Sequence, residues 1–171
     1  MISDNFKCID PNIYFINKGD LLKFNSGDGI IVPISFQYVL NLEMTLLSIK
    51  VSYNLHSTYG KIIDFNNCNS IVMPNWMTDA LSINYNEIVN VEIINLSTIS
   101  EISIISPKNI SDPKCVLEYL LQNHSISYLN KQISTKIFDQ IYTFIIFDQL
   151  PHSVGIIYNC DVIINIKYND V

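Results

Sequence analysis

Three histidines and four cysteines are the residues of this chain best suited to nucleophilic or metal chemistry. They are His56, His124, His152, Cys8, Cys68, Cys115 and Cys160. No Cys-x-x-Cys pair occurs and no histidine stands at metal-ligand spacing, so we expect no structural zinc. The spacing shows no Cys/His dyad, and only the fold can bring such groups together. We expect the histidines in loops at the surface, with His124 at the C-terminal end of a helix, and the four thiols reduced and mostly buried.

Carboxylate pairs are the next candidates, because two acids across a cleft can divide the roles of acid and base. Glu87 with Glu92 and Asp139 with Asp148 alternate with apolar residues or stand at turns, which indicates solvated faces. Cys160-Asp161 follows an apolar strand. A buried thiol beside a turn acid explains this dipeptide better than a nucleophile, which would need a base within hydrogen-bond reach.

Motifs of known catalytic machinery do not occur in the sequence. There is no Gly-x-Ser-x-Gly elbow, phosphate loop, dinucleotide fingerprint or His-Glu-x-x-His pair. Gly27-x-Gly29 lacks the third glycine and the following helix of a dinucleotide site, so it predicts a turn. The sequence therefore favours a protein that is not an enzyme and has no catalytic residues, no cofactor and no metal.

Charge and composition limit the partners and the compartment. Sixteen acids against ten bases give a net charge of −6, and every base is a lysine. Nucleic acid is not an expected partner, because guanine and phosphate recognition relies on arginine and an acidic chain repels a polyanion. A hydrophobic content of 49% predicts a folded core, and no apolar run is long enough to predict a membrane span. The N-terminus, MISDNFKCID, lacks the features of a secretory signal, so we expect a soluble protein that is not secreted.

Strand patterns dominate the first part of the chain. The expected strands are Leu21 to Phe24, Ile30 to Val32, Leu46 to Val51, Lys61 to Phe65, Ser70 to Met73, Ile88 to Leu96 and Ile102 to Ser106. Turns are expected at Asn25 to Gly29, Asn66 to Asn69 and Asn84 to Asn86, because Gly and Asn tolerate left-handed backbone. A short helix is expected over Ser35 to Leu40.

The stretch Pro107 to Pro113, reading PKNISDP, is the expected boundary between a lobe of residues 1–106 and a lobe of residues 107–171. Asp112 predicts an N-cap and Pro113 the first position of a helix that reaches Gln122 or Asn123. Strands are expected again at Gln132 to Ile137, Gln140 to Phe147, Val154 to Tyr158 and Val162 to Lys167. The second lobe is therefore predicted to pack one helix on a small antiparallel sheet.

The segment Ile71 to Met77, reading IVMPNWM, is the most distinctive part of the sequence. Pro74 has no amide hydrogen, so the strand should end there, and its fixed φ suits the first turn of a short helix through Leu81. Trp76, the only tryptophan, is interpreted as a core residue instead of a ligand contact.

The corner Pro74 to Met77, preceded by Tyr59 to Phe65, resembles the N-terminal domain of the ubiquitin fusion degradation protein 1 family. Other segments agree in order and extend the resemblance from about Phe6 to Tyr168: Gly29 to Pro33, Leu47 to Val51, Val89 to Glu92, Asn95-Leu96, Asp112 to Lys114, Val116 to Glu118 and Ile156 to Asp161. The chain departs from the family at Asn84 to Glu87 and at Asn130-Lys131, where asparagine replaces glycine-containing turns and can take the same positive φ. The loop Pro107 to Pro113 is also shorter than usual, which puts in doubt any contact that a longer loop would make.

The resemblance implies a mainly β fold: a double-psi β-barrel lobe followed by a small α/β lobe, as in the N-terminal domain of the valosin-containing AAA+ ATPase. It also implies a non-catalytic module that binds ubiquitin and ubiquitin chains. In the family, the adaptor pairs with its nuclear-protein-localisation partner and delivers ubiquitylated proteins to the ATPase for unfolding and degradation, including ER-associated degradation. The segments that bind that partner and the ATPase lie C-terminal to this domain. The implied location is the cytoplasm and nucleus, with recruitment to the ER surface, and no ubiquitin-contact residue can be carried over.

Three other interpretations stay open. The chain is compatible with the substrate-binding N-terminal domain of an AAA+ ATPase, which a phosphate-loop motif further along the gene would favour. It is also compatible with a paralogue of the adaptor that serves plastid import. Double-psi barrels include enzymes as well, but no Gly-Ser dipeptide for self-cleavage and no Asp-Ser/Thr-Gly protease signature occurs here.

Overall fold

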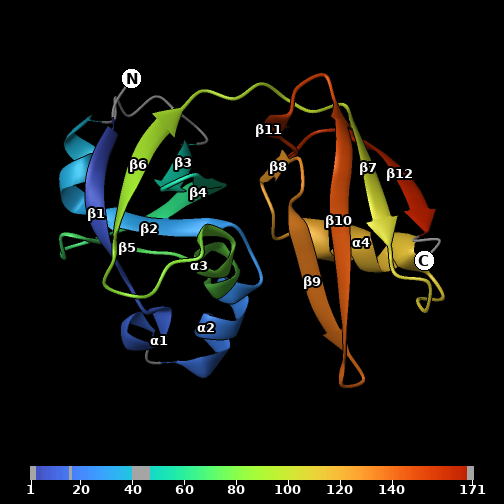
Figure 1. Ribbon diagram of the computed structural model, residues 1–171, viewed down its shortest axis with the longest axis horizontal. Helices are drawn as coiled ribbons and strands as arrows, with labels where there is room; N and C mark the ends of the chain where they lie inside the picture. The colour runs from blue at the N-terminus through green and yellow to red at the C-terminus, as the bar shows by residue number, and fades with distance from the viewer. Residues whose placement is uncertain (1–2, 16, 40–46, 169–171) are drawn as a thin grey trace. The chain divides into compact units, whose positions relative to one another are not determined.

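The computed structural model describes residues 3–15, 17–39 and 47–168 of the chain (Figure 1). The fold is mainly β, as expected, and divides into two compact units, Met1–Asn95 and Leu96–Val171. The strand β7 (Glu101–Ser106) pairs only with strands of the second unit among the described residues. The boundary expected at Pro107 is therefore too late, because β7 belongs to the second sheet.

Six strands of the first unit close into a barrel in the order β1-β5-β2-β4-β3-β6. They are β1 (Ser3–Ile9), β2 (Gly29–Pro33), β3 (Ser48–Tyr53), β4 (His56–Asn66), β5 (Ser70–Val72) and β6 (Ile88–Ile94). Two neighbouring pairs are parallel, β1 with β5 and β2 with β4, and the other pairs are antiparallel. Five of these strands were expected from the sequence, and β1 was missed because only Phe6 and Cys8 of its first six residues are buried.

Short helices connect the barrel strands: α1 (Pro11–Tyr14), α2 (Lys18–Asn25), the 3-10 helix η1 (Ile34–Val39) and α3 (Asn75–Leu81). The strand expected at Leu21 to Phe24 is wrong, since these residues lie in α2. Asn17 caps α2 by accepting a hydrogen bond from the Gly19 N–H, and this cap starts a helix where the apolar run alone suggested a strand. The helix expected at Ser35 to Leu40 is η1, with Leu40 outside the described residues.

The barrel interior is filled by buried apolar side chains from β1, β2, β3, β5 and β6 and from η1 and α3, and partly buried Ile62 and Phe65 of β4 pack against them. Its buried members are Phe6, Cys8, Ile30, Val32, Phe36, Ile49, Val51, Ile71, Met73, Met77, Leu81, Val89 and Val91. The strand β5 ends at Val72, Pro74 is the N-cap of α3, and half-buried Trp76 packs against this core. The corner thus ends the strand as predicted, with Pro74 one position before the helix instead of inside its first turn.

The second unit builds a four-stranded sheet in the order β12-β7-β10-β9, from β9 (Gln132–Ile137), β10 (Gln140–Leu150), β12 (Ile163–Tyr168) and β7. The strand β12 runs parallel to β7, so the sheet is mixed and not antiparallel as expected. Helix α4 (Pro113–Leu121) covers one face, behind β10 in Figure 1, and its Leu117 and Leu120 join the second core with Ile104 and Phe144. A two-stranded sheet pairs β8 (Ile126–Tyr128), which was not predicted, with β11 (Val154–Ile156).

Backbone conformation and thiol burial correct two expectations. Asn86 and Asn130 have positive φ as predicted, but no glycine in the described ranges does. Cys8 is buried, Cys68 and Cys115 are exposed and Cys160 is half-buried, so the expectation of mostly buried thiols is wrong, while all four are free of disulfides.

None of the described helices is long and apolar enough to cross a membrane.

Candidate functional site

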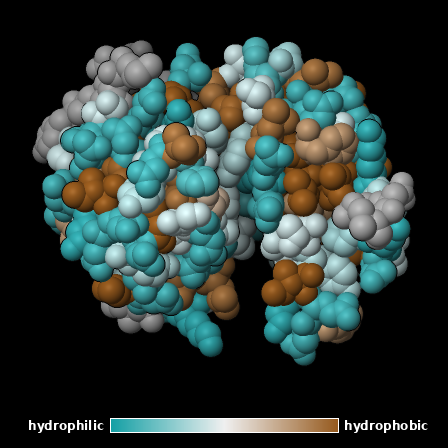
Figure 2. Space-filling view, in the orientation of Figure 1, coloured by the Kyte–Doolittle hydropathy of each residue, from teal (hydrophilic) through white to brown (hydrophobic). Residues whose placement is uncertain are grey.

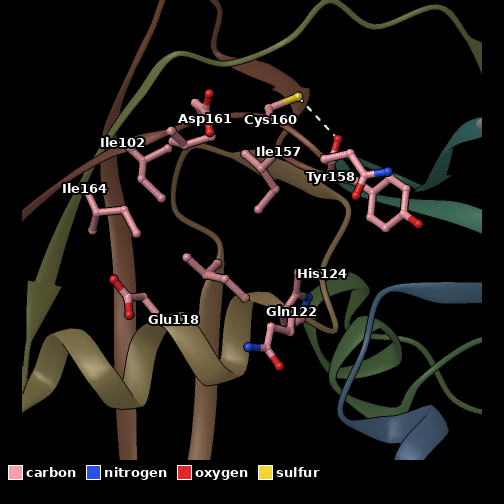
Figure 3. A pocket seen from close by; sticks show the side chains of 12 residues that line it. Ile102, Glu118, Gln122, His124, Ile157, Tyr158, Cys160, Asp161 and Ile164 are labelled. Carbon is pink, nitrogen blue, oxygen red and sulfur yellow. Dashed lines mark hydrogen bonds between the residues drawn. The ribbon is translucent and has the colours of Figure 1, made fainter.

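A groove of about 490 Å³ lies in the second unit, between the C-terminal half of α4, the segment that follows β11, and the strands β7 and β12 (Figure 3). Five apolar side chains line it: Ile102, Leu121, Ile157, Val162 and Ile164. The polar side chains that line it are Glu118, Gln122, His124, Tyr158, Asn159, Cys160 and Asp161. The groove is therefore an apolar surface with a polar border, open to a partner.

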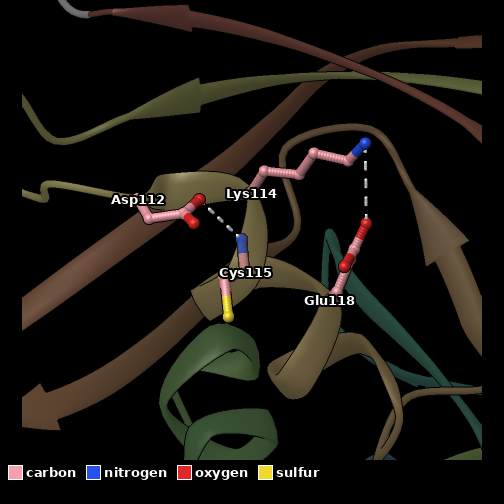
Figure 4. A network of polar contacts seen from close by, with 4 residues as sticks. All are labelled: Asp112, Lys114, Cys115 and Glu118. Carbon is pink, nitrogen blue, oxygen red and sulfur yellow. Dashed lines mark hydrogen bonds and ion pairs between the residues drawn. The ribbon is translucent and has the colours of Figure 1, made fainter.

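Helix α4 forms one wall because its N-terminus is fixed in two ways (Figure 4). The Asp112 carboxylate accepts a hydrogen bond from the Cys115 N–H at 3.0 Å, and Pro113 occupies the first helical turn, as the sequence predicts. One turn further, Lys114 and Glu118 form an exposed pair with 3.8 Å between Nζ and Oε1. An exposed pair at this distance is weak, so the Glu118 carboxylate stays available at the groove.

The segment Ile157 to Val162 forms the opposite wall. Asn159 has φ of 54°, in the left-handed region that asparagine tolerates, and it turns the chain toward Cys160. The Cys160 thiol donates a hydrogen bond to the Tyr158 carbonyl oxygen at 3.2 Å, visible as the dashed line in Figure 3. The thiol is thus turned to a backbone acceptor, and Asp161 is exposed beside it.

The electrostatic character of the groove comes from Glu118 and Asp161, which stand on opposite walls. Lys114 is paired with Glu118 from outside the lining residues. The apolar floor and acidic border can hold a partner surface that is apolar at its centre and basic around it, because such a partner removes apolar area from water and brings opposite charges together.

His124 differs from its prediction. Its N–H donates a hydrogen bond to the Leu121 carbonyl oxygen at 3.0 Å, which places it just after the helix end, as expected. Its side chain is only 5% exposed, so the predicted surface position is wrong. The helix end turns inward to start the buried strand β8, and this turn carries His124 to the base of the groove.

The remaining candidates from the sequence do not share this groove. His56 and His152 are exposed, the first at the start of β4 and the second after β10, and neither lines it. Asp139 stands at a hairpin tip, where it pairs with Lys136 at 2.7 Å, and Asp148 is exposed on β10. The structure therefore separates this pair of acids along one long strand.

Glu87 and Glu92 also have separate surroundings. A carboxylate oxygen of Glu87 accepts a hydrogen bond from the Asn84 N–H at 3.0 Å, while Glu92 lies opposite Lys50 on the neighbouring strand. In the part of the chain that the structure describes, no three His, Cys, Asp or Glu side chains are grouped so as to hold a metal ion.

The sequence predicts no functional role for three of the groove residues. From the sequence, Glu118 belongs to a helical segment that resembles the family, Asp161 is a turn acid and Cys160 is a buried thiol. The two acids share a signal, because each lies close to an apolar segment: Glu118 is followed by Tyr119-Leu120-Leu121 and Asp161 by Val162. The parallel pairing of β12 with β7, which brings these segments together, has no signature in the sequence.

The sequence was compared with family models and with curated proteins, and neither comparison finds a match.

Proposed function

We propose that this chain is a non-catalytic ubiquitin-recognition module of the ubiquitin fusion degradation protein 1 type. The proposal rests on the collinear segments that resemble that family, from the corner at Pro74 to Met77 through Ile156 to Asp161. The observation that carries it in the structure is the apolar groove of the second unit with Glu118 and Asp161 at its border.

The proposal includes the finer topology of the barrel. A double-psi barrel contains two interlocked motifs, each with neighbouring parallel strands that are not consecutive in the chain. The pairs β1 with β5 and β2 with β4 have this property, because β2 to β4 lie between the first pair and β3 lies between the second. This arrangement supports a double-psi barrel as the first unit.

A groove of this kind gives a weak contact with a single ubiquitin. Its apolar floor is shallow, and its acidic border contributes more to orientation and association rate than to affinity. Several ubiquitins in one chain raise the overall affinity, because the second contact forms at the high effective concentration set by the first. The module would then favour chains over single ubiquitin without a deep pocket.

The role in the cell follows from the same resemblance. We propose that the module belongs to an adaptor that presents ubiquitylated proteins to the valosin-containing AAA+ ATPase in the cytoplasm and nucleus and at the ER surface. The nuclear-protein-localisation partner and the ATPase would bind segments outside this chain. A role as the N-terminal domain of the ATPase itself differs in one measurable respect, since it requires an ATPase region in the same polypeptide.

The test is an NMR titration of the isotope-labelled chain with ubiquitin and with ubiquitin chains. We expect shifts at Leu121, Ile157 and Asp161, with larger apparent affinity for the chains. The Glu118→Lys variant should weaken binding about fivefold or more, since it reverses a border charge. Asp79→Lys, the same kind of charge reversal at an exposed acid on α3 of the first unit, should leave binding unchanged.

Two results would count against the proposal. An absence of shifts with both ligands would remove ubiquitin as a partner. Shifts confined to the first unit, insensitive to Glu118→Lys, would retain ubiquitin but reject the groove as its site.

A further inference from the structure

The strand β12 forms one edge of the four-stranded sheet of the second unit (Figure 1). It pairs in parallel with β7 on one side, and no described strand pairs with it on the other side. The Ile163 N–H donates a hydrogen bond to the Ser100 carbonyl oxygen at 2.9 Å, so the backbone groups of Ile163 point toward β7. Because backbone direction alternates from residue to residue along a strand, the N–H and C=O groups of Ile164 and Ile166 point away from the sheet. The edge therefore offers a row of backbone donors and acceptors to a further strand.

The strand β12, all of whose residues the structure describes, lacks the features that protect most sheet edges. It reads IINIKY, without proline, and its register with β7 is unbroken along the whole strand. Its only lysine, Lys167, holds its Nζ 4.8 Å from the centre of the Phe147 ring on β10, so the ammonium group lies over the sheet instead of in front of the edge. An edge of this kind is suited to β-strand addition, in which an extended peptide joins a sheet as an additional strand.

The groove of Figure 3 borders this edge of the sheet and not the opposite one. Ile164 of β12 and Val162 just before it line the groove, whereas none of the lining residues comes from β9, the strand at the other edge. Across the groove from Ile164 stand Glu118 and Leu121 of α4. Side chains alternate along a strand, so a strand added to β12 directs every second side chain into the groove.

The other side of the sheet, which α4 does not cover, offers an added strand a second apolar contact. Ile163 at the start of β12 is 64% exposed on this side, and Leu150 of β10, in the same register row through Glu101, is 51% exposed. A brown hydrophobic area lies over this sheet in the space-filling view (Figure 2). The side chains of an added strand that do not enter the groove therefore also remove apolar surface from water.

The charge of the groove favours a basic partner. Glu118 on α4 and the exposed Asp161, two positions before β12, both line the groove, and none of its lining residues is a lysine. Pairing of β12 with the same strand of a second copy would place the α4 helices of both copies, each with its Glu118, on one side of the joined sheet, so acid would face acid. A peptide with basic residues beside its apolar ones has the complementary charge.

We propose that the edge of β12 binds an extended basic peptide of another protein, which adds to the sheet antiparallel to β12. The peptide backbone pairs with Ile164 and Ile166, apolar side chains at every second position enter the groove, and flanking lysine or arginine side chains meet Glu118 and Asp161. Antiparallel pairing is the more stable of the two directions per residue. The inference does not rest on the proposed ubiquitin contact, because strand addition requires an extended chain and not a folded partner.

The test uses the full isotope-labelled chain and the synthetic peptide KVTVTVK. In the free chain, the amides of Ile164 and Ile166 should exchange with solvent faster than those of Ile163 and Asn165, which face β7. Addition of the peptide to about 1 mM should shift the Ile164 and Ile166 resonances and slow their exchange about fivefold or more.

Two control peptides separate the backbone pairing from the charge. The same peptide N-methylated at its three valines keeps every side chain but cannot donate to the edge, so it should cause neither shift nor protection. The peptide EVTVTVE should bind about fivefold more weakly or less, because its ends repel Glu118 and Asp161.

A variant of the edge tests the same pairing from the side of the protein. Ile166→Pro removes an N–H that points away from β7, a position where an edge strand tolerates proline, and it should weaken peptide binding about tenfold or more. Ile166→Val is the matched control, because it also loses apolar volume but keeps the N–H, and it should bind the peptide as the wild type does. The thermal transition of each variant verifies that it is folded, and the N-methylated peptide tests the pairing on the unaltered chain.

Three results overturn the proposal: no shift at Ile164 and Ile166, equal binding of the N-methylated peptide, or protection of these amides by higher concentrations of the chain alone, which would assign the edge to a second copy. Binding of ubiquitin without binding of KVTVTVK would reject this inference and leave the proposed function in place. Binding of the peptide without any response to ubiquitin would do the reverse.

Discussion

The indole Nε1 of Trp76 donates a hydrogen bond to the Gly27 carbonyl oxygen at 2.9 Å, across 49 positions of sequence. The bond joins the N-terminal turn of α3 to the turn that precedes β2. Asn75 reinforces the same junction, because its N–H donates to the Asn25 side chain at 3.0 Å. Trp76 therefore connects the IVMPNWM corner to the end of α2 while its ring packs on the barrel core.

Replacement of Trp76 separates the contribution of the ring from that of the hydrogen bond. Trp76→Phe keeps an aromatic ring and leaves the Gly27 carbonyl without its donor, so we expect a loss of about 1–2 kcal/mol of unfolding free energy. Trp76→Ala removes the ring as well and should cost about 3 kcal/mol, at the low end for aromatic truncation because the side chain is half-buried. Urea denaturation of the two variants measures both values, and equal losses would contradict a separate contribution from the hydrogen bond.

Gly60 allows two barrel strands to approach closely. A Cβ atom at this position would lie 2.5 Å from the Asp28 carbonyl oxygen and 2.7 Å from a carbon of Ile30. Since one of these atoms is backbone, the barrel must shift to accept alanine, and we expect Gly60→Ala to cost about 1–3 kcal/mol. Gly19→Ala is the control, because the atom nearest to its Cβ would be Oδ1 of the capping Asn17 at 3.3 Å, and a shift of the neighbour by a few tenths of an ångström relieves this contact. The melting temperature should fall clearly for Gly60→Ala and change little for Gly19→Ala.

The glycines also show why part of the fold could not be predicted. The residue types at three positions correctly predicted the N-cap at Asp112, the end of β5 before Pro74 and the positive φ of Asn130. The glycines at the turn before β2 were expected to supply left-handed backbone, yet no described glycine has positive φ. Gly60 is needed for a contact with residues about thirty positions earlier, and a contact of that kind leaves no local pattern.

The candidate site was harder to predict than the strands. A strand is recognised from consecutive residues, whereas the groove combines α4, the turn at Asn159 and the inner sides of β7 and β12. Glu118 and Asp161 look like ordinary surface acids until the parallel pairing of β12 with β7 brings them to one groove. The same pairing explains why the two units divide after Asn95, before the boundary expected at Pro107, because it places β7 in the second sheet.

Cys8 should make the stability of the protein fall at alkaline pH. Burial, with a smaller contribution from the Asp10 charge, raises the pKa of the Cys8 thiol from 9.0 to about 12. Above pH 9 the unfolded chain ionises at this residue while the folded chain keeps its proton, so ionisation favours unfolding. The stabilisation is fully present below pH 9 and should be lost between pH 9 and 12, at up to about 1.4 kcal/mol per pH unit.

The Cys8→Ala variant isolates this effect. Tyr14 and Tyr85 also have raised pKa values because of burial, and they act in the same direction in both proteins. Urea denaturation from pH 7 to 11 should therefore show a steeper alkaline decline for the wild type than for the variant. Parallel declines would mean that the thiol ionises equally easily in the folded and unfolded chains.

Phe138 occupies an unfavourable position at the tip of the β9–β10 hairpin. Phe138 and Asp139 have φ of 46° and 65°, the two positive values of a turn that favours asparagine and glycine, and the phenylalanine is 98% exposed. Because packing does not compensate for left-handed backbone at so exposed a residue, Phe138→Asn should stabilise the chain by about 1 kcal/mol. Phe138→Val should destabilise it, since a β-branched residue tolerates positive φ least. Equal melting temperatures for the asparagine and valine variants would show that the tip is not strained in solution.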